Sequence, residues 1–255
     1  MIFYFSGTGN SKWIARQFAA RLDDTLLFIP DAIEQGRYEF SLKTDEKIGF
    51  IFPIYSWGPP EIVIHFIQKL ILLGYQRHYM YFICSCGDDV GLTRQVFEET
   101  VLRKGWRCNA GFSVAMPNSY VLLPGFDVDS NELKERKLSN AKDRVPELIG
   151  KIEKRSEEFS LVEGSMPFIK TRVIRPLFNR YQMSPKKFHV TDACIGCKRC
   201  EKACPVGNVS VDGKLPEWGM NCTACLACYH ICPQQAVQYG GRTKKKGQYC
   251  NPDVW

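Results

Sequence analysis

Short apolar segments alternate with helical patterns over the first 120 residues of the chain. Continuous apolar runs predict strands over residues 1–5, 26–29, 48–54, 79–85 and 112–116. Between them, the spacing of apolar positions predicts helices over residues 11–22, 60–73 and 92–104. Strands that alternate with helices form a parallel sheet with helices on both faces, and strands buried on both sides are apolar throughout. The pattern therefore predicts an α/β domain with a doubly wound parallel sheet.

The rest of the chain divides into segments of different character. Residues 131–160 are charged, with apolar positions at helical spacing, which predicts an amphipathic helix that Pro146 can kink. Residues 165–190 carry six Lys or Arg and no Asp or Glu. From about Thr191 the sequence is rich in Cys, Gly and Pro, and its two halves repeat one motif. We therefore expect one domain at residues 1–160, a basic linker at 161–189, and a second domain with a basic C-terminal tail at 190–255.

Composition and charge limit the possible functions. Apolar residues make up 45% and charged residues 24% of the chain, which excludes a disordered or collagen-like protein. No apolar run approaches the roughly 20 residues of a membrane span, and the N-terminus lacks the basic region of a signal peptide. We therefore expect a cytoplasmic protein without a membrane span. The net charge of +7 and the basic segment leave nucleic acid, a membrane surface or an acidic protein open as partners.

The chain has twelve cysteines, and eight of them lie between Cys194 and Cys232. Residues 194–205 and 222–233 both have the spacing Cys-x2-Cys-x2-Cys-x3-Cys-Pro. In a cytosolic protein, cysteines at this density are more often metal ligands than disulfides. Structural zinc sites usually pair two short cysteine knuckles, so the duplicated spacing favours iron–sulfur clusters over zinc. Four cysteines lie outside the two units, and we expect them to be small buried apolar residues rather than metal ligands: Cys84, Cys86, Cys108 and Cys250.

Residues 190–240 resemble the two-cluster bacterial ferredoxins over their whole length. The resemblance implies a small α+β domain that holds two [4Fe-4S] clusters. In this pattern three cysteines of one unit bind one cluster, and the fourth binds the other cluster. The implied ligands are Cys194, Cys197, Cys200 and Cys232 for cluster one, and Cys222, Cys225, Cys228 and Cys204 for cluster two.

The loop after the first predicted strand suits a phosphate group. Residues 6–11 read Ser-Gly-Thr-Gly-Asn-Ser and lead directly into a predicted helix. Backbone N–H groups at a helix N-terminus, together with small hydroxyl side chains, bind phosphate well. The loop lacks a Walker A sequence, and Lys12 stands where a dinucleotide fingerprint needs its third glycine. A serine-rich turn without a ligand is the alternative interpretation.

Two further loops follow predicted strands, at residues 53–58 and 84–89. In doubly wound sheets, ligands bind at the carboxyl ends of the strands. The three loops resemble those of flavodoxins, which implies the sheet order 2-1-3-4-5 and an FMN site. The implied FMN contacts are Ser6, Thr8, Gly9, Asn10 and Ser11 at the phosphate, Pro53, Tyr55, Ser56, Trp57 and Gly58 in the first ring loop, and Cys86, Gly87 and Asp88 in the second. By this resemblance Trp57 stacks on the isoalloxazine ring and the Gly58 peptide meets flavin N5.

The second ring loop departs from the flavodoxin pattern. Many flavodoxins carry a Tyr or Trp shortly after this loop, whereas Val90 and Gly91 occupy those places here. The outer face of the ring is then either open or covered by Tyr120, which follows the fifth predicted strand.

The chain as a whole resembles the flavodoxin-like/ferredoxin fusion proteins of anaerobes, often labelled EFR-type ferredoxins. The features that carry this resemblance are the loop 6–11, the Pro117-Asn118 pair, the segment 213–218 and the tail at 249–252. The resemblance implies electron transfer between two [4Fe-4S] clusters and FMN, with redox proteins as donor and acceptor. Two clusters and a phosphate dianion would add a charge of about −6, so the net charge of +7 does not favour nucleic acid as a partner.

Two alternatives fit the same residues. One is a flavin reductase with its own small-molecule or protein substrate. The other is an iron- or redox-sensing module that binds a partner through residues 165–190. No set of catalytic acid and base residues is evident, so the sequence leaves open whether the protein is an electron carrier or an FMN/iron–sulfur oxidoreductase.

Overall fold

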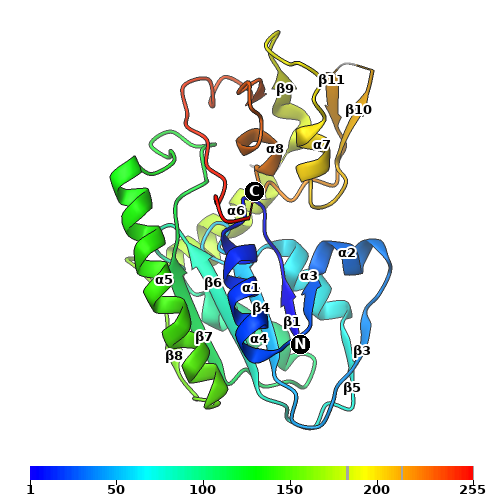
Figure 1. Cartoon of the computed structure of the whole chain (residues 1–255), viewed down its shortest axis with the longest axis vertical. Coiled ribbons are helices and arrows are strands. Elements are labelled where there is room, and N and C mark those ends of the chain that lie inside the picture. The colour runs from blue at the N-terminus through cyan, green and yellow to red at the C-terminus, as the bar shows by residue number, and fades with distance from the viewer. Residues whose placement is uncertain (182–183, 214, 255) are drawn as a thin grey trace.

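The computed structural model describes residues 1–181, 184–213 and 215–254. Residues 182–183 of the expected linker, Lys214 of the segment 213–218 and the last residue of the expected second domain lie outside the described residues. Figure 1 shows a larger α/β part with a smaller part stacked on one end of its sheet. In the part of the chain that the structure describes, no helix has the length and apolar character to cross a membrane.

The central sheet is parallel throughout and has the strand order β2-β1-β4-β6-β7-β8. Its strands are β1 (Ile2–Tyr4), β2 (Leu26–Phe28), β4 (Ile48–Pro53), β6 (Met80–Cys86), β7 (Ala110–Ala115) and β8 (Phe159–Ser160). The five predicted strands thus adopt the order 2-1-3-4-5, which confirms the expected flavodoxin-like fold class. The short edge strand β8 was not predicted, because two residues leave no readable pattern.

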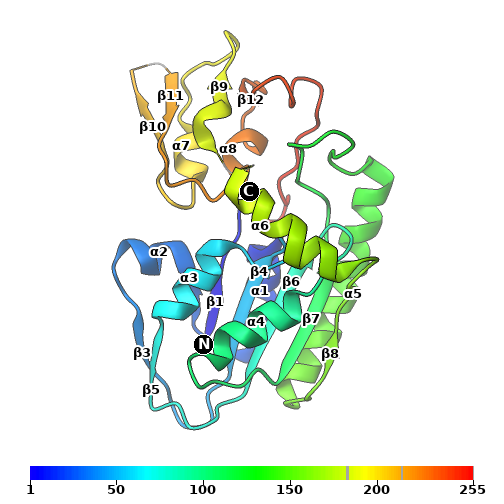
Figure 2. The same ribbon diagram turned by 180° about the vertical axis from the view of Figure 1, so that it is seen from behind.

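Helices cover both faces of this sheet, as predicted. The helices of the larger part are α1 (Asn10–Leu22), α2 (Ile29–Glu34), α3 (Glu61–Lys69), α4 (Thr93–Leu102) and α5 (Asn131–Glu153). Figure 1 shows α1 and α5 on one face, and Figure 2 shows α3 and α4 on the other. Helix α5 continues through Pro146 to Glu153, and Ser130 caps its start by accepting a hydrogen bond from the Leu133 amide at 3.2 Å.

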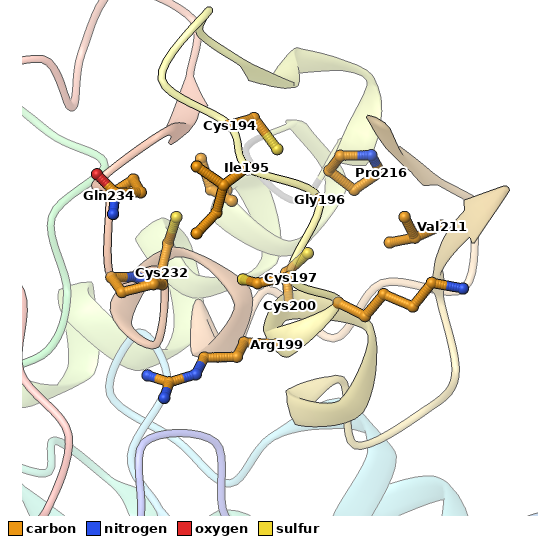
Figure 3. A pocket seen from close by; sticks show the side chains of 13 residues that line it. Cys194, Ile195, Gly196, Cys197, Arg199, Cys200, Val211, Pro216, Cys232 and Gln234 are labelled. Atoms are coloured by element: carbon orange, nitrogen blue, oxygen red, sulfur yellow. The ribbon is translucent and has the colours of Figure 1, made fainter. Parts of the chain in front are cut away.

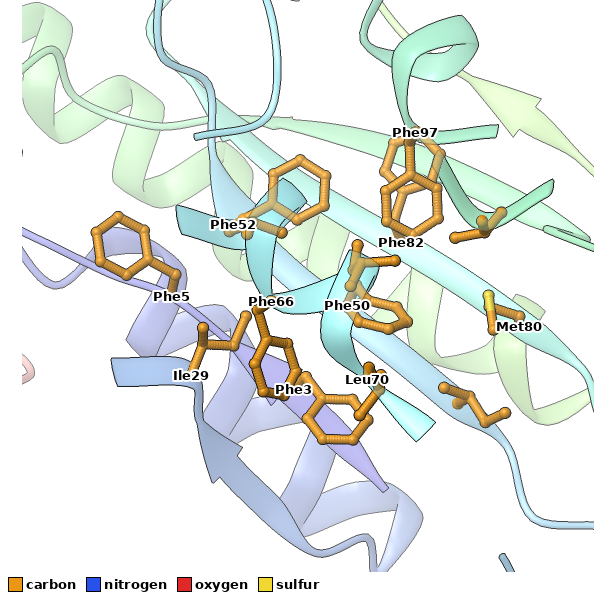
Figure 4. Close-up of a cluster of buried hydrophobic side chains, with 14 of the residues drawn as sticks. Phe3, Phe5, Ile29, Phe50, Phe52, Phe66, Leu70, Met80, Phe82 and Phe97 are labelled. Carbon is orange, nitrogen blue, oxygen red and sulfur yellow. The ribbon is translucent and has the colours of Figure 1, made fainter. Parts of the chain in front are cut away.

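Alternate residues of the central strands supply two separate cores. Successive side chains of a strand point to opposite faces. Phe3, Phe50 and Phe82 therefore face α3 and α4, where they pack with Phe66 and Phe97 (Figure 4). The intervening strand residues face α1 and α5, where they join Phe18, Val145 and Leu148 among others. The strands are consequently fixed in register, and their carboxyl ends are held at one edge.

The helix predicted over residues 60–73 is shorter than expected. Helix α3 ends at Lys69, where Leu70 takes an extended conformation, and β5 (Ile71–Leu73) follows. This strand pairs in parallel with β3 (Glu39–Ser41) in a separate two-stranded sheet. The prediction was wrong here because a short continuous apolar run does not distinguish a buried helix from a strand by periodicity.

Much of the segment expected as a basic linker is helical. A π-helix, η1 (Ile169–Ile174), continues into α6 (Arg175–Tyr181). Figure 2 shows that this helical segment crosses the carboxyl end of the sheet. We call η1 and α6 together the strap. Arg172 of the strap pairs with Glu99 of α4, and Arg175 pairs with Glu61 of α3 at 2.8 Å.

The smaller part is an arrangement of short strands and helices, as the predicted α+β domain requires. A 3-10 turn, η2 (Pro185–Lys187), leads into β9 (Phe188–Val190), which pairs antiparallel with β12 (Val237–Tyr239). A hairpin is formed by β10 (Val209–Asp212) and β11 (Leu215–Trp218). Two short helices, α7 (Arg199–Ala203) and α8 (Ala227–His230), begin within the two cysteine units.

The C-terminal tail joins the two parts of the molecule. The Tyr249 hydroxyl donates to Asn10 Oδ1 at 2.7 Å, and the Asn251 amide donates to the Thr8 carbonyl at 2.8 Å. On its other side, the Tyr249 amide donates to Nδ1 of His230 at 3.1 Å. The second nitrogen of His230 lies 2.7 Å from the Ser119 carbonyl, so it must carry the proton. Tyr249 and Asn251 are buried, which makes the tail an internal connection between α1 and α8.

We predict that Tyr249→Ala loosens the junction between the two parts. The substitution removes a buried ring and one hydrogen bond, at a cost of about 3 kcal/mol, which corresponds to more than a hundredfold faster local opening. Hydrogen–deuterium exchange should accelerate in residues 6–12 and 227–232. The control Tyr75→Ala removes a half-buried ring that packs on the far core and should leave those two segments protected. Equal acceleration in both variants would contradict the role of the tail.

Candidate functional site

One pocket is lined by all four cysteines expected for cluster one. Cys194, Cys197 and Cys200 come from the first unit, and Cys232 comes from the second (Figure 3). The remaining lining is largely apolar or backbone and includes Ile195, Gly196, Val211, Pro216, Pro233 and Val237. The fold therefore places the fourth cysteine of the second unit beside the first three cysteines of the first unit, as the ferredoxin pattern requires.

The four cysteines expected for cluster two also lie close together. Burial raises the thiol pKa of Cys222, Cys225 and Cys228, that of Cys225 to about 12, and the charge on Cys204 raises each further. A bound metal centre would have to overcome this cost of burial, because a coordinated thiol is deprotonated. Among the described residues, no group of three or more His, Cys, Asp or Glu side chains is placed to hold a single metal ion.

The two cysteine units share one backbone conformation. Left-handed residues occur at matching positions, in the pairs Gly196 and Ala224, Lys198 and Leu226, and Gly207 and Gln235. In both units the amide four residues after the last cysteine donates to its sulfur, at 3.1 Å in Cys204 and 3.3 Å in Cys232. Hydrogen bonds to cysteine sulfur stabilise the negative charge of an iron–sulfur cluster. The duplicated sequence is thus a duplicated binding loop.

A second pocket of about 430 Å³ lies at the carboxyl edge of the sheet. This volume is within the range of small-molecule and cofactor sites. The lining includes most of the residues expected at FMN: Ser6, Thr8, Asn10, Ser11, Pro53, Tyr55, Ser56, Trp57, Cys86, Gly87, Asp88 and Tyr120. Three loops that are far apart in the sequence therefore surround one cavity.

Gly9 and Gly58 are the expected flavin residues that do not line this pocket. Gly9 precedes α1 with a φ of 100°, a conformation that glycine adopts without strain. The Cβ position of Gly58 faces the strap, because a Cβ atom there would lie 2.4 Å from Nε of Arg175. The absence of a side chain at Gly58 thus makes room for the strap.

Three buried polar atoms of the pocket lining have no hydrogen-bond partner among the described residues. These are the hydroxyl oxygens of Ser56 and Tyr120 and Oδ1 of Asp89. Buried polar groups nearly always have a partner, so two orphaned hydroxyls in one cavity indicate a missing ligand. Ser56 and Trp57 also have positive φ angles of 47° and 58°, and strained conformations of this kind concentrate at binding sites. The pocket therefore fits a polar ligand that reaches both loops.

The strap supplies pocket residues that the sequence analysis missed: Lys170, Ile174 and Phe178. Thr171 fixes the strap, because its hydroxyl donates to the Trp57 carbonyl and accepts from the Leu92 amide, both at 2.9 Å. Gly91 has a φ of 55°, and a Cβ atom there would lie 2.4 Å from Thr171 Oγ1. This contact explains why no aromatic residue stands at Gly91, where many flavodoxins carry one near the second ring loop. The strap occupies the space that such a side chain would need.

Tyr120 belongs to an aromatic group at the pocket wall. Its ring makes edge contacts with Phe126 at 5.6 Å and with Phe178 of the strap at 5.7 Å, measured between ring centroids. Leu123 completes this apolar wall. Of these residues, the sequence analysis expected Tyr120 at the outer face of the ring but did not identify Phe126 or Phe178 as its neighbours.

The second cysteine unit forms part of the same pocket. Ala224, Cys225 and Leu226 line it together with the loop of residues 6–11. A Cβ atom at Gly7 would lie 2.7 Å from Cys225 Cβ and 2.8 Å from the Cys225 carbonyl oxygen. The Tyr55 hydroxyl is also buried beside this unit, and burial with the charges of Cys225 and Cys222 raises its pKa well above the usual value. A cysteine expected at cluster two is therefore in direct contact with the phosphate-type loop.

Comparison with protein families gives one match, which lies in the smaller part. Residues 193–237 match the family described as the 4Fe-4S dicluster domain. This match confirms the expected iron–sulfur character of the segment and covers less than half of the chain. A search of curated proteins found no significant match.

Solved structures with a partial likeness cover the larger part. The Trp repressor binding protein from Bacillus subtilis is 20% identical, with a TM-score of 0.34, over 55% of this chain and 95% of that one. The FMN-dependent NADH-azoreductase from Bacillus anthracis is 10% identical, with a TM-score of 0.35, over 59% and 97%. Rubredoxin oxygen:oxidoreductase from Desulfovibrio gigas is 18% identical, with a TM-score of 0.33, over 59% and 36%.

Proposed function

We propose that this protein transfers electrons within one chain between two [4Fe-4S] clusters and one FMN. The observation that carries the proposal is the shared wall of the second pocket, where residues 224–226 lie against the loop of residues 6–11. When bound, FMN exchanges one or two electrons and each cluster exchanges one. The work of the chain is to bind these groups and to hold them close together.

In this proposal the phosphate of FMN is bound mainly by backbone N–H groups at the start of α1. The side chain of Asn10 already donates to the Pro117 carbonyl at 3.0 Å and accepts from Tyr249 and Asn251. The Ser11 hydroxyl shares a hydrogen bond of 2.8 Å with Ser85. These side chains fix the shape of the loop, which leaves Ser6 and Thr8 as the hydroxyl groups available to the phosphate.

The proposed order of the two clusters and FMN follows from how exposed the cysteine ligands are to solvent. Cys197 of cluster one is exposed, and so are the neighbouring Lys198 and Arg199. Cys225 of cluster two instead packs against the core of the larger part. Cluster one is thus the proposed contact with redox partner proteins, and cluster two is the proposed neighbour of FMN. This arrangement agrees with the resemblance to EFR-type fusion proteins and with a role in the cytoplasm.

We predict about eight irons, eight sulfides and one FMN per chain after anaerobic purification. Replacing either crossing cysteine, by Cys204→Ala or Cys232→Ala, should reduce the iron content to about four, because each variant breaks one ligand set. Cys108→Ala is the matched control, since that buried thiol lies outside both units. Iron, sulfide and flavin analysis measures this outcome, and stoichiometric zinc without visible absorption would contradict it.

We predict that Trp57→Ala weakens FMN binding about tenfold or more and raises flavin fluorescence, because a stacked indole both packs against the ring and quenches it. Trp57→Phe should retain part of the affinity, since an aromatic ring remains. Fluorescence titration of the three proteins measures both effects. If affinity and emission are unchanged in Trp57→Ala, the indole does not contact the ring.

We predict that Gly7→Ala slows electron transfer from the reduced clusters to FMN at least several-fold. The added methyl group would overlap the backbone of Cys225 and push the two sites apart. Gly241→Ala is the control, because a Cβ atom there has no neighbour within 4 Å. Flash photolysis with FMN content measured on the same samples separates slower transfer from loss of flavin. An equal rate in both variants would exclude this contact as the route.

A further inference from the structure

The second pocket contains one cation that no flavin loop provides. Among the described residues that line it, Lys170 of the strap is present and no other Lys or Arg is. Its Nζ atom lies 5.5 Å from the centroid of the Trp57 ring and 2.6 Å from Oδ2 of Asp89. The side chains of Lys170 and Asp89 are 17% and 18% exposed, so this charge is largely removed from water.

The ion pair of Lys170 is not needed to hold the strap in place. The strap is already fixed on its outer side by the pairs of Arg172 with Glu99 and of Arg175 with Glu61. Thr171 fixes its inner side through two hydrogen bonds. A largely buried ion pair costs desolvation energy and contributes little net stability. A structural role therefore does not explain why a lysine lies at this position.

The placement of Asp89 keeps the cation directed at the pocket. Oδ2 of Asp89 is enclosed by Gly164, where an added Cβ atom would lie 2.3 Å away. Its Oδ1 atom is buried and has no hydrogen-bond partner among the described residues. The other acid of the lining, Asp88, has a side chain that is 79% exposed, so its charge is screened by water. Lys170 is thus the one positive charge among the described lining residues of the pocket, and Asp89 offsets part of that charge.

We propose that Lys170 tunes the bound flavin, its ammonium group favouring the reduced form of the ring over the oxidised form. This inference rests on the proposed function, because it requires FMN in the second pocket. Reduction makes the ring system more negative, and nearby charge is one of the means by which a protein adjusts a flavin. One charge a few ångströms away in a partly hydrated pocket changes such an equilibrium about tenfold. The strap would then do more than cover the pocket, since it would set the driving force for electron transfer.

The test is an anaerobic redox titration of the holoprotein, in which flavin and cluster absorption are followed separately. Lys170→Met should lower the equilibrium constant for two-electron reduction of the bound flavin about tenfold, which equals about 30 mV. Lys170→Arg should restore it, and Asp89→Asn should change it in the opposite direction. Arg172→Met is the control for displacement of the strap, because it removes a cation that anchors the strap and does not line the pocket.

The outcomes separate this inference from the proposed function. If wild type binds FMN and Lys170→Met leaves the flavin equilibrium unchanged, the inference is overturned and the proposed function stands. An equal decrease in Lys170→Met, Lys170→Arg and Arg172→Met would also overturn it, because that result reports a displaced strap. A wild-type protein that binds no FMN after anaerobic reconstitution would overturn both.

Discussion

The contact between the loop of residues 6–11 and Cys225 is the constraint on which the arrangement of the molecule depends. At Gly7 the two backbones approach so closely that one methyl group would not fit. A flavodoxin-like sheet can present its carboxyl edge to any partner, and a ferredoxin-like unit can present either cluster. The contact at Gly7 places the second cysteine unit against the carboxyl edge of the sheet. The C-terminal tail and His230 then keep the two parts in this arrangement through hydrogen bonds to both of them.

The sheet provides the rigid base for this contact. Phenylalanine side chains on one face and mixed aliphatic and aromatic side chains on the other bury the strands on both sides. Because the strand ends are fixed, the three loops that follow them converge at one edge, where the hydrogen bond between Ser11 and Ser85 joins two of them. The strap adds the fourth side of the pocket and is attached by ionic and hydroxyl contacts rather than by a core. The pocket is therefore enclosed by the loops at the strand ends on one side and by Lys170, Ile174 and Phe178 of the strap on the other.

The sequence was sufficient to predict the features that depend on local pattern. The strands, the cysteine spacing and the three loops could be predicted, because each follows from residues that are near one another in the chain. The strand order came from the resemblance of the three loops to those of flavodoxins. The role of the strap could not be predicted, because the basic character of residues 165–190 does not show that Arg172 and Arg175 pair with Glu99 and Glu61. The close approach of Arg175 to Gly58 could not be predicted either, since a glycine indicates that another group can come close but does not identify that group. Long-range contacts of this kind, including Gly7 with Cys225, leave no local signature.

The tail also has a consequence for the order in which the protein is built. The loop of residues 6–11 is synthesised well before the tail, yet Asn10 accepts a hydrogen bond from a tyrosine 239 positions later. Between these two residues the ribosome must produce the whole sheet, the strap and both cysteine units. The junction between the two parts is therefore completed late, when every cysteine of both units has already emerged. A chain whose second cysteine unit failed to fold would lack the pocket wall of residues 224–226 and the His230 partner of the tail, so the pocket would stay incomplete.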